Sequence, residues 1–284
     1  LFNMRRNLKM PKMLSYNDKG TWIHNLCGVT KLVFFLLWTI TAMICYDIRV
    51  LSVMVVISVI IFIVSKTSFS QVKGVFTFVL VFLCINLFAI FLFAPTHGTE
   101  LYGTEHVLFT ITKKYVVTAE QLFYEAHVFI KYIVIVPSVF TFLVTTNPSE
   151  FAASLNRVGI GYKGCYALAL ALRYIPDVQS DFTKIRNSQA ARGIEMSKKA
   201  SLINRIRHTA TIIFPLIFTS MDRIDVISNA MELRCFGKNK KRTWYMGRPL
   251  KAADYIVIAA TVILSVVALL ITFSNGSRFY NPFI

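Results

Sequence analysis

Long apolar runs constrain this chain more than any other feature of its sequence. Four of them carry almost no charge: Val29–Tyr46, Leu51–Ser65, Val75–Phe93 and Ala252–Phe273. About 20 such residues, folded as a helix, cross the hydrocarbon core of a bilayer. Backbone groups in lipid have no water to bond, so these segments are expected to be helical. Charged residues make up only 16% of the chain, against about 25% in soluble domains. The runs therefore predict a polytopic membrane protein.

A further span is predicted between Thr118 and Thr146. Thr118 and Gln121 fit a capping box, in which each side chain satisfies the free backbone N–H of the other. The apolar stretch Val128–Val144 follows, with Lys131 as its one charge. We expect this lysine to snorkel or to face a neighbouring helix.

Two β-rich segments precede this span. They are Val107–Thr112 and Tyr115–Thr118. Short runs of this composition, separated by two residues, predict a hairpin. We expect it to lie outside the bilayer.

The distribution of basic residues predicts the orientation. Residues 147–251 hold eighteen basic and seven acidic side chains, a net charge of +11, and the segment up to Lys31 holds six basic ones. Residues 94–127 hold two lysines against four glutamates. Lys and Arg accumulate on the cytoplasmic side. We therefore expect a cytoplasmic N-terminus, an external C-terminus and about five spans. The predicted regions are a membrane region 1–146, a cytoplasmic module 147–251 and a last span 252–284.

The module is predicted to contain three helices, two of them long and crossed. The first begins at Asn147-Pro148, because Asn is a good N-cap and Pro suits the first helical position, and glycines 159 and 161 end it. The second runs from about Gly164 to Arg192 and the third from about Ala200 to Phe236. Gly193 and Gly237 follow them, as glycine does after many helices. Kinks or hinges are expected at two prolines, Pro176 and Pro215.

Several kinds of chemistry are not indicated. The sequence contains no phosphate-binding glycine loop, so the chain is not expected to bind or hydrolyse ATP alone. His97 and His106 share one loop but give only weak support for a metal site, which needs three or four convergent ligands. No catalytic residue, metal or cofactor is predicted. The widely spaced cysteines are expected to be small buried thiols rather than a disulfide framework; they are Cys27, Cys45, Cys84, Cys165 and Cys235.

Two motifs at the ends of the long helices resemble a known family. Gln189-Ala190-Ala191-Arg192-Gly193 ends one helix, and Ala230-Met231-Glu232-Leu233-Arg234-Cys235-Phe236-Gly237 ends the next. These Ala-Arg-Gly-like motifs, together with 145–151 (TTNPSEF) and 172–176 (LRYIP), resemble the transmembrane T subunit of energy-coupling factor transporters, the EcfT/CbiQ-like proteins. The second motif departs from the pattern, because it reads Leu-Arg-Cys instead of Ala-Arg-Gly.

The resemblance implies a non-catalytic subunit of an ABC importer in the bacterial cell membrane. Its implied partners are two ABC-type ATPases, which bind ATP and Mg, and a small substrate-binding S subunit for a vitamin or metal ion. Arg192 and Arg234 are implied to enter grooves on the ATPases. The implied coupling residues are the two triplets Ala191, Arg192, Gly193 and Leu233, Arg234, Cys235.

Other functions are compatible with parts of the sequence. A self-contained secondary transporter or channel would place acidic or polar groups at mid-membrane, which the spans lack. A membrane-anchored binder of nucleic acid would carry a basic stripe, whereas acidic residues interleave here, so no nucleic-acid partner is expected. Each arginine could also simply complement a helix dipole, worth about 0.3–1 kcal/mol. The sequence leaves vitamin and cobalt or nickel cargo open.

Overall fold

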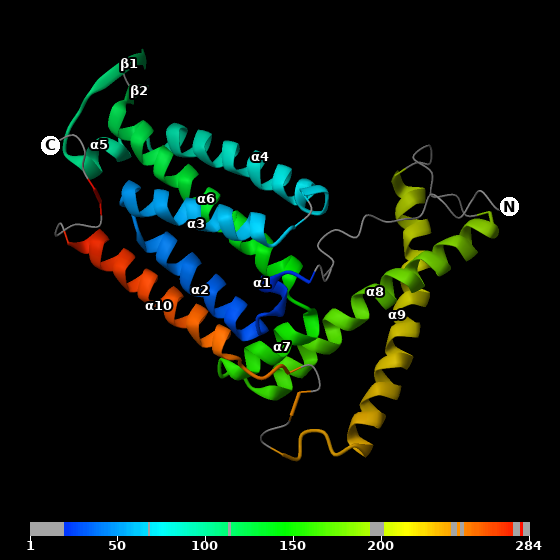
Figure 1. The fold of residues 1–284 in the computed structure, drawn as a ribbon. Helices are drawn as coiled ribbons and strands as arrows, with labels where there is room; N and C mark the ends of the chain where they lie inside the picture. Colours follow the sequence, from blue (N-terminus) through cyan, green and yellow to red (C-terminus); the bar gives the residue numbers. More distant parts are fainter. Residues whose placement is uncertain are drawn as a thin grey trace. The chain divides into compact units, whose positions relative to one another are not determined.

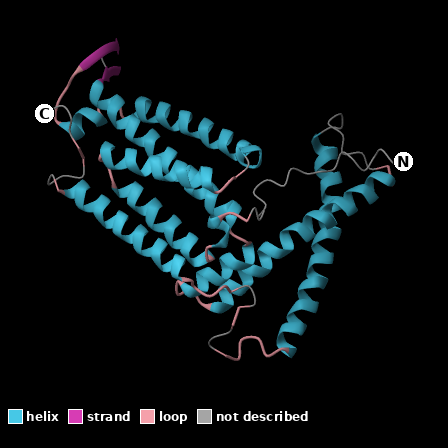
Figure 2. Cartoon of the chain, in the orientation of Figure 1, coloured by secondary structure: helices cyan, strands magenta, loops and turns pink. Residues whose placement is uncertain are grey.

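The computed structural model describes residues 20–67, 69–112, 115–193, 202–239, 243–244, 247–274 and 279–280. This part is almost entirely helical, with one two-stranded sheet (Figure 2). The chain divides into two compact units. We call Leu1–Asn147 with Arg248–Ile284 the membrane unit, and Pro148–Gly247 the crossed-helix unit. The predicted all-α polytopic membrane fold is confirmed.

Five apolar helices build the membrane unit. Three of them, α4, α6 and α10, are long and apolar enough to cross a bilayer, while α2 and α3 have 17 residues each. At 1.5 Å per residue these two are about 26 Å long, near the lower limit for a span. The helices of the unit are α1 (Trp22–Asn25), α2 (Gly28–Ile44), α3 (Ile48–Val64), α4 (Phe69–Phe93), α5 (His97–Tyr102), α6 (Ala119–Thr145) and α10 (Ala252–Phe273).

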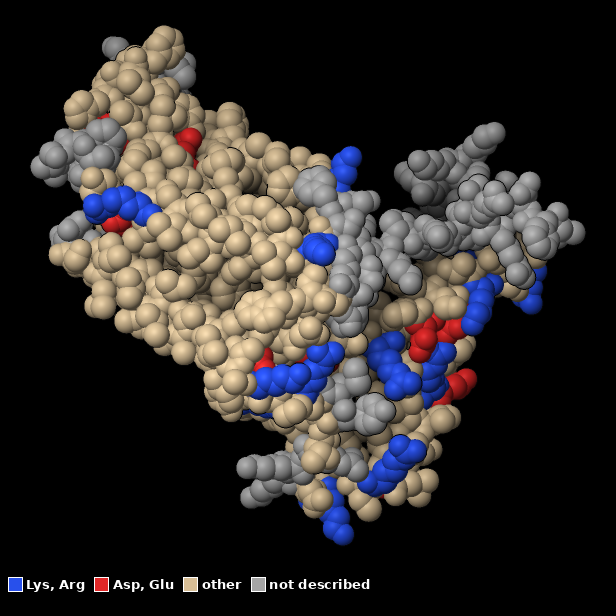
Figure 3. All heavy atoms as spheres, in the orientation of Figure 1, with Lys and Arg blue, Asp and Glu red and all other residues tan. Residues whose placement is uncertain are grey.

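Helix α6 is the centre of the membrane unit. It packs against α2, α3 and α4, and α10 packs against α2 and α3 (Figure 1). Trp38, Leu51 and Val134, from three helices, are fully buried at their contact. The Trp38 indole N–H donates to Ser58 Oγ at 2.8 Å, which satisfies both groups away from water. On the face shown in Figure 3, charged side chains of this unit lie near its ends and leave an uncharged band between them.

Two aspartates near the span ends, and one lysine inside a span, are buried and hydrogen-bonded. Asp47 accepts bonds from the backbone and the guanidinium of Arg49, and Asp254 accepts from Cys27 N and Thr30 Oγ1 at 2.8 Å each. Lys131 Nζ donates to Met43 O at 2.9 Å. The lysine therefore faces a neighbouring helix, as predicted.

The predicted hairpin is confirmed. Strands β1 (Val107–Thr112) and β2 (Tyr115–Thr118) pair in antiparallel register. The capping box is only half correct. Thr118 Oγ1 accepts from Gln121 N at 3.3 Å, but the Gln121 side chain accepts instead from Gly98 N at 2.9 Å, because α5 lies against the start of α6.

The crossed-helix unit contains α7 (Pro148–Arg157), α8 (Tyr162–Ala191) and α9 (Leu202–Leu233). Helices α8 and α9 pack against each other and cross in Figure 1. Gly159 ends α7 with φ +113°, whereas Gly161 is the N-cap of α8 rather than part of the end of α7. Both long helices continue through their prolines, Pro176 and Pro215. Kinks at these positions stay a prediction, and the expected start of α9 near Ala200 lies outside the described residues.

Candidate functional site: two arginine-bearing helix ends

The end of α8 is shaped by a glycine. Ala191 is the last helical residue, Arg192 is the C-cap, and Gly193 has φ +83°. The Gly193 N–H donates to Ala190 O at 3.1 Å, which satisfies one of the free carbonyls at the helix end. This backbone conformation favours glycine because an L side chain would crowd the following carbonyl. The motif glycine therefore turns the chain immediately after the arginine.

The end of α9 has the same kind of turn without a glycine in that position. Cys235 has φ +54°, and its N–H donates to Glu232 O at 2.8 Å. The Phe236 N–H donates to Met231 O at 3.0 Å, which completes a Schellman motif. The predicted end of this helix at Phe236 is therefore wrong by three residues: it ends at Leu233, because the left-handed residue comes before Gly237.

The departure from the Ala-Arg-Gly pattern thus leaves the turn geometry in place. Left-handed backbone in a residue with a side chain costs about 1–2 kcal/mol, and the surrounding bonds hold Cys235 in it.

The expectation that all five cysteines are buried is wrong for Cys235 and for Cys84, which are exposed, whereas the other three are buried.

Both arginines lie at exposed tips of long helices. Ala191, Arg192 and Gly193 are exposed, as are Arg234 and Cys235, and Leu233 is 86% exposed. Helices α8 and α9 have 30 and 32 residues, which corresponds to about 45 and 48 Å. A guanidinium is always charged and offers a planar fork for bidentate contact with carboxylates. The two tips can therefore present permanent positive charge to an acidic partner.

Polar contacts hold the two long helices against each other. Arg223 Nη2 of α9 donates to Asp181 Oδ2 of α8 at 2.5 Å, and Lys184 lies 3.2 Å from the other oxygen of that carboxylate. Hydrogen bonds from Arg223 and Lys184 hold the pKa of the Asp181 carboxyl below its ordinary value. Gln189 Nε2 donates to Thr211 O at 3.5 Å nearer the tip of α8. The contacts of Arg223 and Gln189 therefore link α8 to α9 at two points along their lengths.

An aromatic cluster that the sequence reasoning missed supports the second tip. The Phe236 ring lies 5.7 Å from the Tyr162 ring and 4.7 Å from the Tyr166 ring, centroid to centroid. The Trp244 indole donates to Asn156 Oδ1 at 3.0 Å. These rings and Arg234 line a cavity of about 400 Å³. The spacing of Tyr162 and Tyr166 at i and i+4 was the available signal, since such residues share a helix face.

Helix α9 also carries an exposed apolar stripe. Its members follow an i, i+3, i+4, i+7, i+10 spacing, which keeps them on one face of the helix. All are more than 45% exposed, from 47% at Ile217 to 63% at Phe218. Contiguous apolar surface of this kind marks an interaction site. The stripe consists of Phe214, Ile217, Phe218, Met221 and Ile224.

The two histidines between α4 and α6 have local partners. His106 Nδ1 lies 2.7 Å from Glu120 Oε1, and the His97 ring packs edge-on against Tyr124. Within the described ranges, no group of three or more His, Cys, Asp or Glu side chains is placed to hold a metal ion.

Comparison with known proteins shows that the chain is similar to membrane proteins of one transport family. Residues 19–245 match the family model CbiQ, described as cobalt transport protein. The chain is 24% identical to an energy-coupling factor transporter transmembrane protein EcfT of Clostridium kluyveri, over 90% of this chain and 94% of that protein. It is 26% identical to the EcfT of Lactococcus lactis, over 58% of this chain and 65% of the relative. A putative ABC transporter ATP-binding protein of Bifidobacterium longum is 32% identical over 43% of this chain, but only 16% of its own length.

Proposed function

The chain belongs to the CbiQ cobalt transport protein family, and from this premise we propose that it is the membrane-embedded coupling subunit of an energy-coupling factor importer. It transmits ATP-driven motion of two ABC-type ATPases to a substrate-binding S subunit. The subunit itself is non-catalytic, and ATP and Mg are bound by the partners. The observation that carries the proposal is the pair of exposed arginines, Arg192 and Arg234, each capping a long helix ahead of a left-handed turn.

The geometry of the tips suits docking into a groove. A left-handed residue follows each arginine, so the helix ends there and the arginine lies at its tip. A carboxylate in such a cleft would meet the guanidinium as a charge-assisted pair. Ala191 and Leu233 lie beside the arginines and provide apolar contact at the two tips.

The crossing of α8 and α9 supports transmission of motion. The Asp181–Arg223 contact links the helices between their tips and their other ends. If closure of the ATPases moves one tip, the linked pair moves as a body. The apolar stripe of α9 would then carry the S subunit with it. The cargo of that subunit is a micronutrient, either a vitamin or a metal ion such as cobalt or nickel.

The charge distribution supports an orientation in the bacterial cell membrane. Residues 147–251 carry a net charge of +11, eighteen basic less seven acidic side chains, which favours the cytoplasm. The crossed-helix unit would thus face the ATPases. The N-terminus would be cytoplasmic and the C-terminus external.

Co-purification with charge-reversed tips tests the proposal. The tagged chain is expressed in its native host and extracted in mild detergent, and retained proteins are identified by mass spectrometry. We expect two ABC ATPases and one small hydrophobic protein. Each of the single variants Arg192→Glu and Arg234→Glu should retain less ATPase protein on purification, because the reversed charge repels an acidic groove. Arg186→Glu serves as the matched control, because Arg186 is exposed on α8 but lies away from the tip.

Two results would contradict the proposal. One is full ATPase retention by the double variant Arg192→Glu, Arg234→Glu. The other is purification of the wild-type chain without any ATPase while it still transports solute alone, which would favour a secondary transporter or channel. Salt-sensitive retention of nucleic acid in place of ATPases would favour the basic binding protein.

A further inference from the structure

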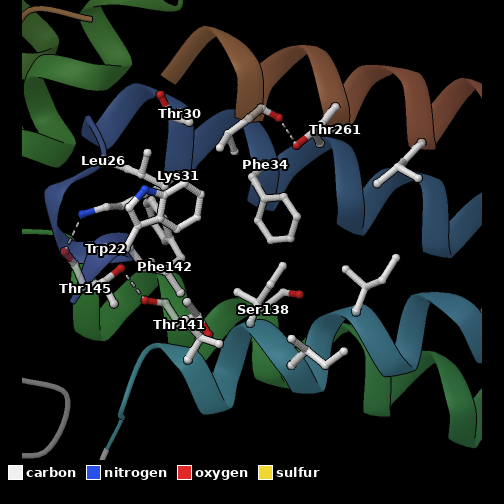
Figure 4. A pocket seen from close by; sticks show the side chains of 18 residues that line it. Trp22, Leu26, Thr30, Lys31, Phe34, Ser138, Thr141, Phe142, Thr145 and Thr261 are labelled. Carbon is white, nitrogen blue, oxygen red and sulfur yellow. Dashed lines mark hydrogen bonds between the residues drawn. The ribbon is translucent and has the colours of Figure 1, made fainter. Parts of the chain in front are cut away.

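The cavity at the end of α9 combines aromatic rings with positive charge. It lies within the crossed-helix unit, and its volume of about 400 Å³ is in the range of sites that hold a ligand or an inserted side chain. Its wall mixes polar and apolar surface. The chamber of the membrane unit that Phe34 and Ser138 line exposes almost no polar surface (Figure 4). The cavity in the crossed-helix unit therefore has the chemistry to select one occupant.

One face of α8 forms much of the cavity wall. The residues on this face have the spacing i, i+4, i+7, i+8, i+11, which places them on the same side of a helix. They are Tyr162, Tyr166, Ala169, Leu170 and Arg173. The end of α9 and the chain that follows it complete the wall. The cavity is thus built by regular helix geometry and not by an irregular loop alone.

Contacts among the aromatic rings hold the wall in place. The Tyr166 ring lies 4.7 Å from the Phe236 ring and 6.5 Å from the Trp244 ring, centroid to centroid, with interplanar angles of 40° and 45°. The Trp244 indole N–H donates to Asn156 Oδ1 at 3.0 Å, which fixes this ring as well. Tilted rings are a favoured arrangement for aromatic pairs. An aromatic side chain that enters the cavity meets rings that are already ordered, so little further entropy is lost.

Basic side chains surround the aromatic wall. Arg173 is exposed, and among the described residues no carboxylate forms an ion pair with it, including Asp177 one turn along α8. Lys163 and Lys238 line an adjoining pocket that shares Tyr162 with the cavity. This local excess of positive charge attracts an acidic partner.

The composition of the cavity points to a protein partner. Tyr, Trp, Phe, Met and Arg are the residues enriched at the centres of protein interfaces, where a few anchors in pockets supply most of the binding energy. Met231 and Arg234 bring two of these types from the end of α9. Arg234 is also the arginine of the second tip. A partner that engages this tip therefore lies next to the cavity.

We propose that the cavity receives an aromatic side chain from an acidic segment of the ABC ATPase that docks at the second tip. The inserted ring packs among Tyr166, Phe236 and Trp244, and a carboxylate of the same segment pairs with Arg173. This inference rests on the coupling function proposed above. It adds an anchor in the opposite direction, because the ATPase also projects a side chain into this chain.

Photo-cross-linking from inside the cavity identifies the occupant. A photoreactive phenylalanine replaces Met231 in the full chain, native membranes are irradiated, and the adduct is digested and sequenced by mass spectrometry. We expect an ATPase peptide of negative net charge, linked at or beside a Phe, Tyr or Trp. A lipid adduct, an adduct with a second copy of this chain, or an ATPase peptide without an aromatic residue would overturn the proposal.

Filling the cavity tests whether the anchor contributes to binding. Ala169→Trp places a ring in the cavity, and Ala171→Trp is the matched control, because Ala171 is exposed on α8 and does not line the cavity. ATPase retained on purification in mild detergent should fall strongly in Ala169→Trp only. Arg173→Glu should retain about tenfold less, since loss of a charge-assisted hydrogen bond weakens binding by about this factor. Its control, Arg186→Glu, should retain the wild-type amount.

The same retention assay separates failure of the anchor from failure of the coupling function. Arg173→Glu keeps the test decisive if Ala169→Trp does not fold, because Arg173 is exposed. Wild-type retention by Arg173→Glu or by folded Ala169→Trp, while Arg234→Glu loses the ATPase, would overturn the anchor and leave the coupling function in place. Absence of any ATPase from the wild-type preparation would overturn both.

Discussion

Replacement of Gly193 by alanine tests whether the left-handed turn fixes the first arginine tip. Gly193 has φ +83°, and a Cβ added there would meet no heavy atom within 4 Å. The substitution therefore creates no clash, and its whole cost is backbone strain. That cost is about 1–2 kcal/mol for an L residue in left-handed backbone. We expect the last turn of α8 to open more often by this amount.

Hydrogen exchange of the purified protein in detergent measures this opening. A cost of 1–2 kcal/mol corresponds to about 5- to 30-fold faster exchange in the last turn of α8, at about 1.4 kcal/mol for each factor of ten. Gly164→Ala is the matched control, because Gly164 lies within α8 and its added Cβ also meets nothing within 4 Å. It should stabilise the helix by about 0.5–1 kcal/mol. Equal exchange in the two variants would refute the role assigned to the turn.

Three further predictions follow from the structure. Cys235→Gly removes the backbone strain of a side chain at φ +54°, and this gain exceeds the entropy cost of glycine. Hydrogen exchange at the Phe236 amide should therefore slow by about two- to fivefold. Faster exchange would contradict this. Gly98→Ala places a Cβ 2.6 Å from Gln121 Cα, so we expect loss of folded protein on size-exclusion chromatography, and a normal yield would refute it. The pKa of Asp181 is lowered by Arg223, so its carboxylate stabilises the fold above its unfolded pKa of about 3.9 and loses this as pH falls through the lower folded value. The wild type should therefore have a higher melting temperature than Asp181→Asn at pH 7, and the difference should disappear in acid. A difference that persists in acid would contradict the assignment.

The membrane helices could be predicted well from the sequence because each covers a long, continuous apolar segment. The apolar runs locate α2, α3, α4 and α10 to within a few residues at most ends, although α4 begins at Phe69 rather than Val75. Helix ends that depend on local backbone geometry were harder to predict. Gly237 suggested the end of α9, but the left-handed residue is Cys235, and no propensity rule selects cysteine there.

The arginine tips were predicted from motifs, whereas their surroundings depend on contacts across the fold. The cavity at Arg234 joins Tyr162 and Tyr166 of α8 to Trp244, which is far away in sequence. The convergence of Lys31 and Arg248 on His24 O likewise joins the two ends of the chain. Such pairings need the helix packing, and single-sequence periodicity does not contain it.

Site-directed photo-cross-linking at the second tip tests the central claim most directly. Leu233 is 86% exposed beside Arg234, so a photoreactive phenylalanine at this position reports what the tip contacts in native membranes. We predict a covalent adduct with an ABC ATPase, reduced several-fold when Arg234→Glu is added. An adduct with lipid alone, or an ATPase adduct unchanged by Arg234→Glu, would contradict the account.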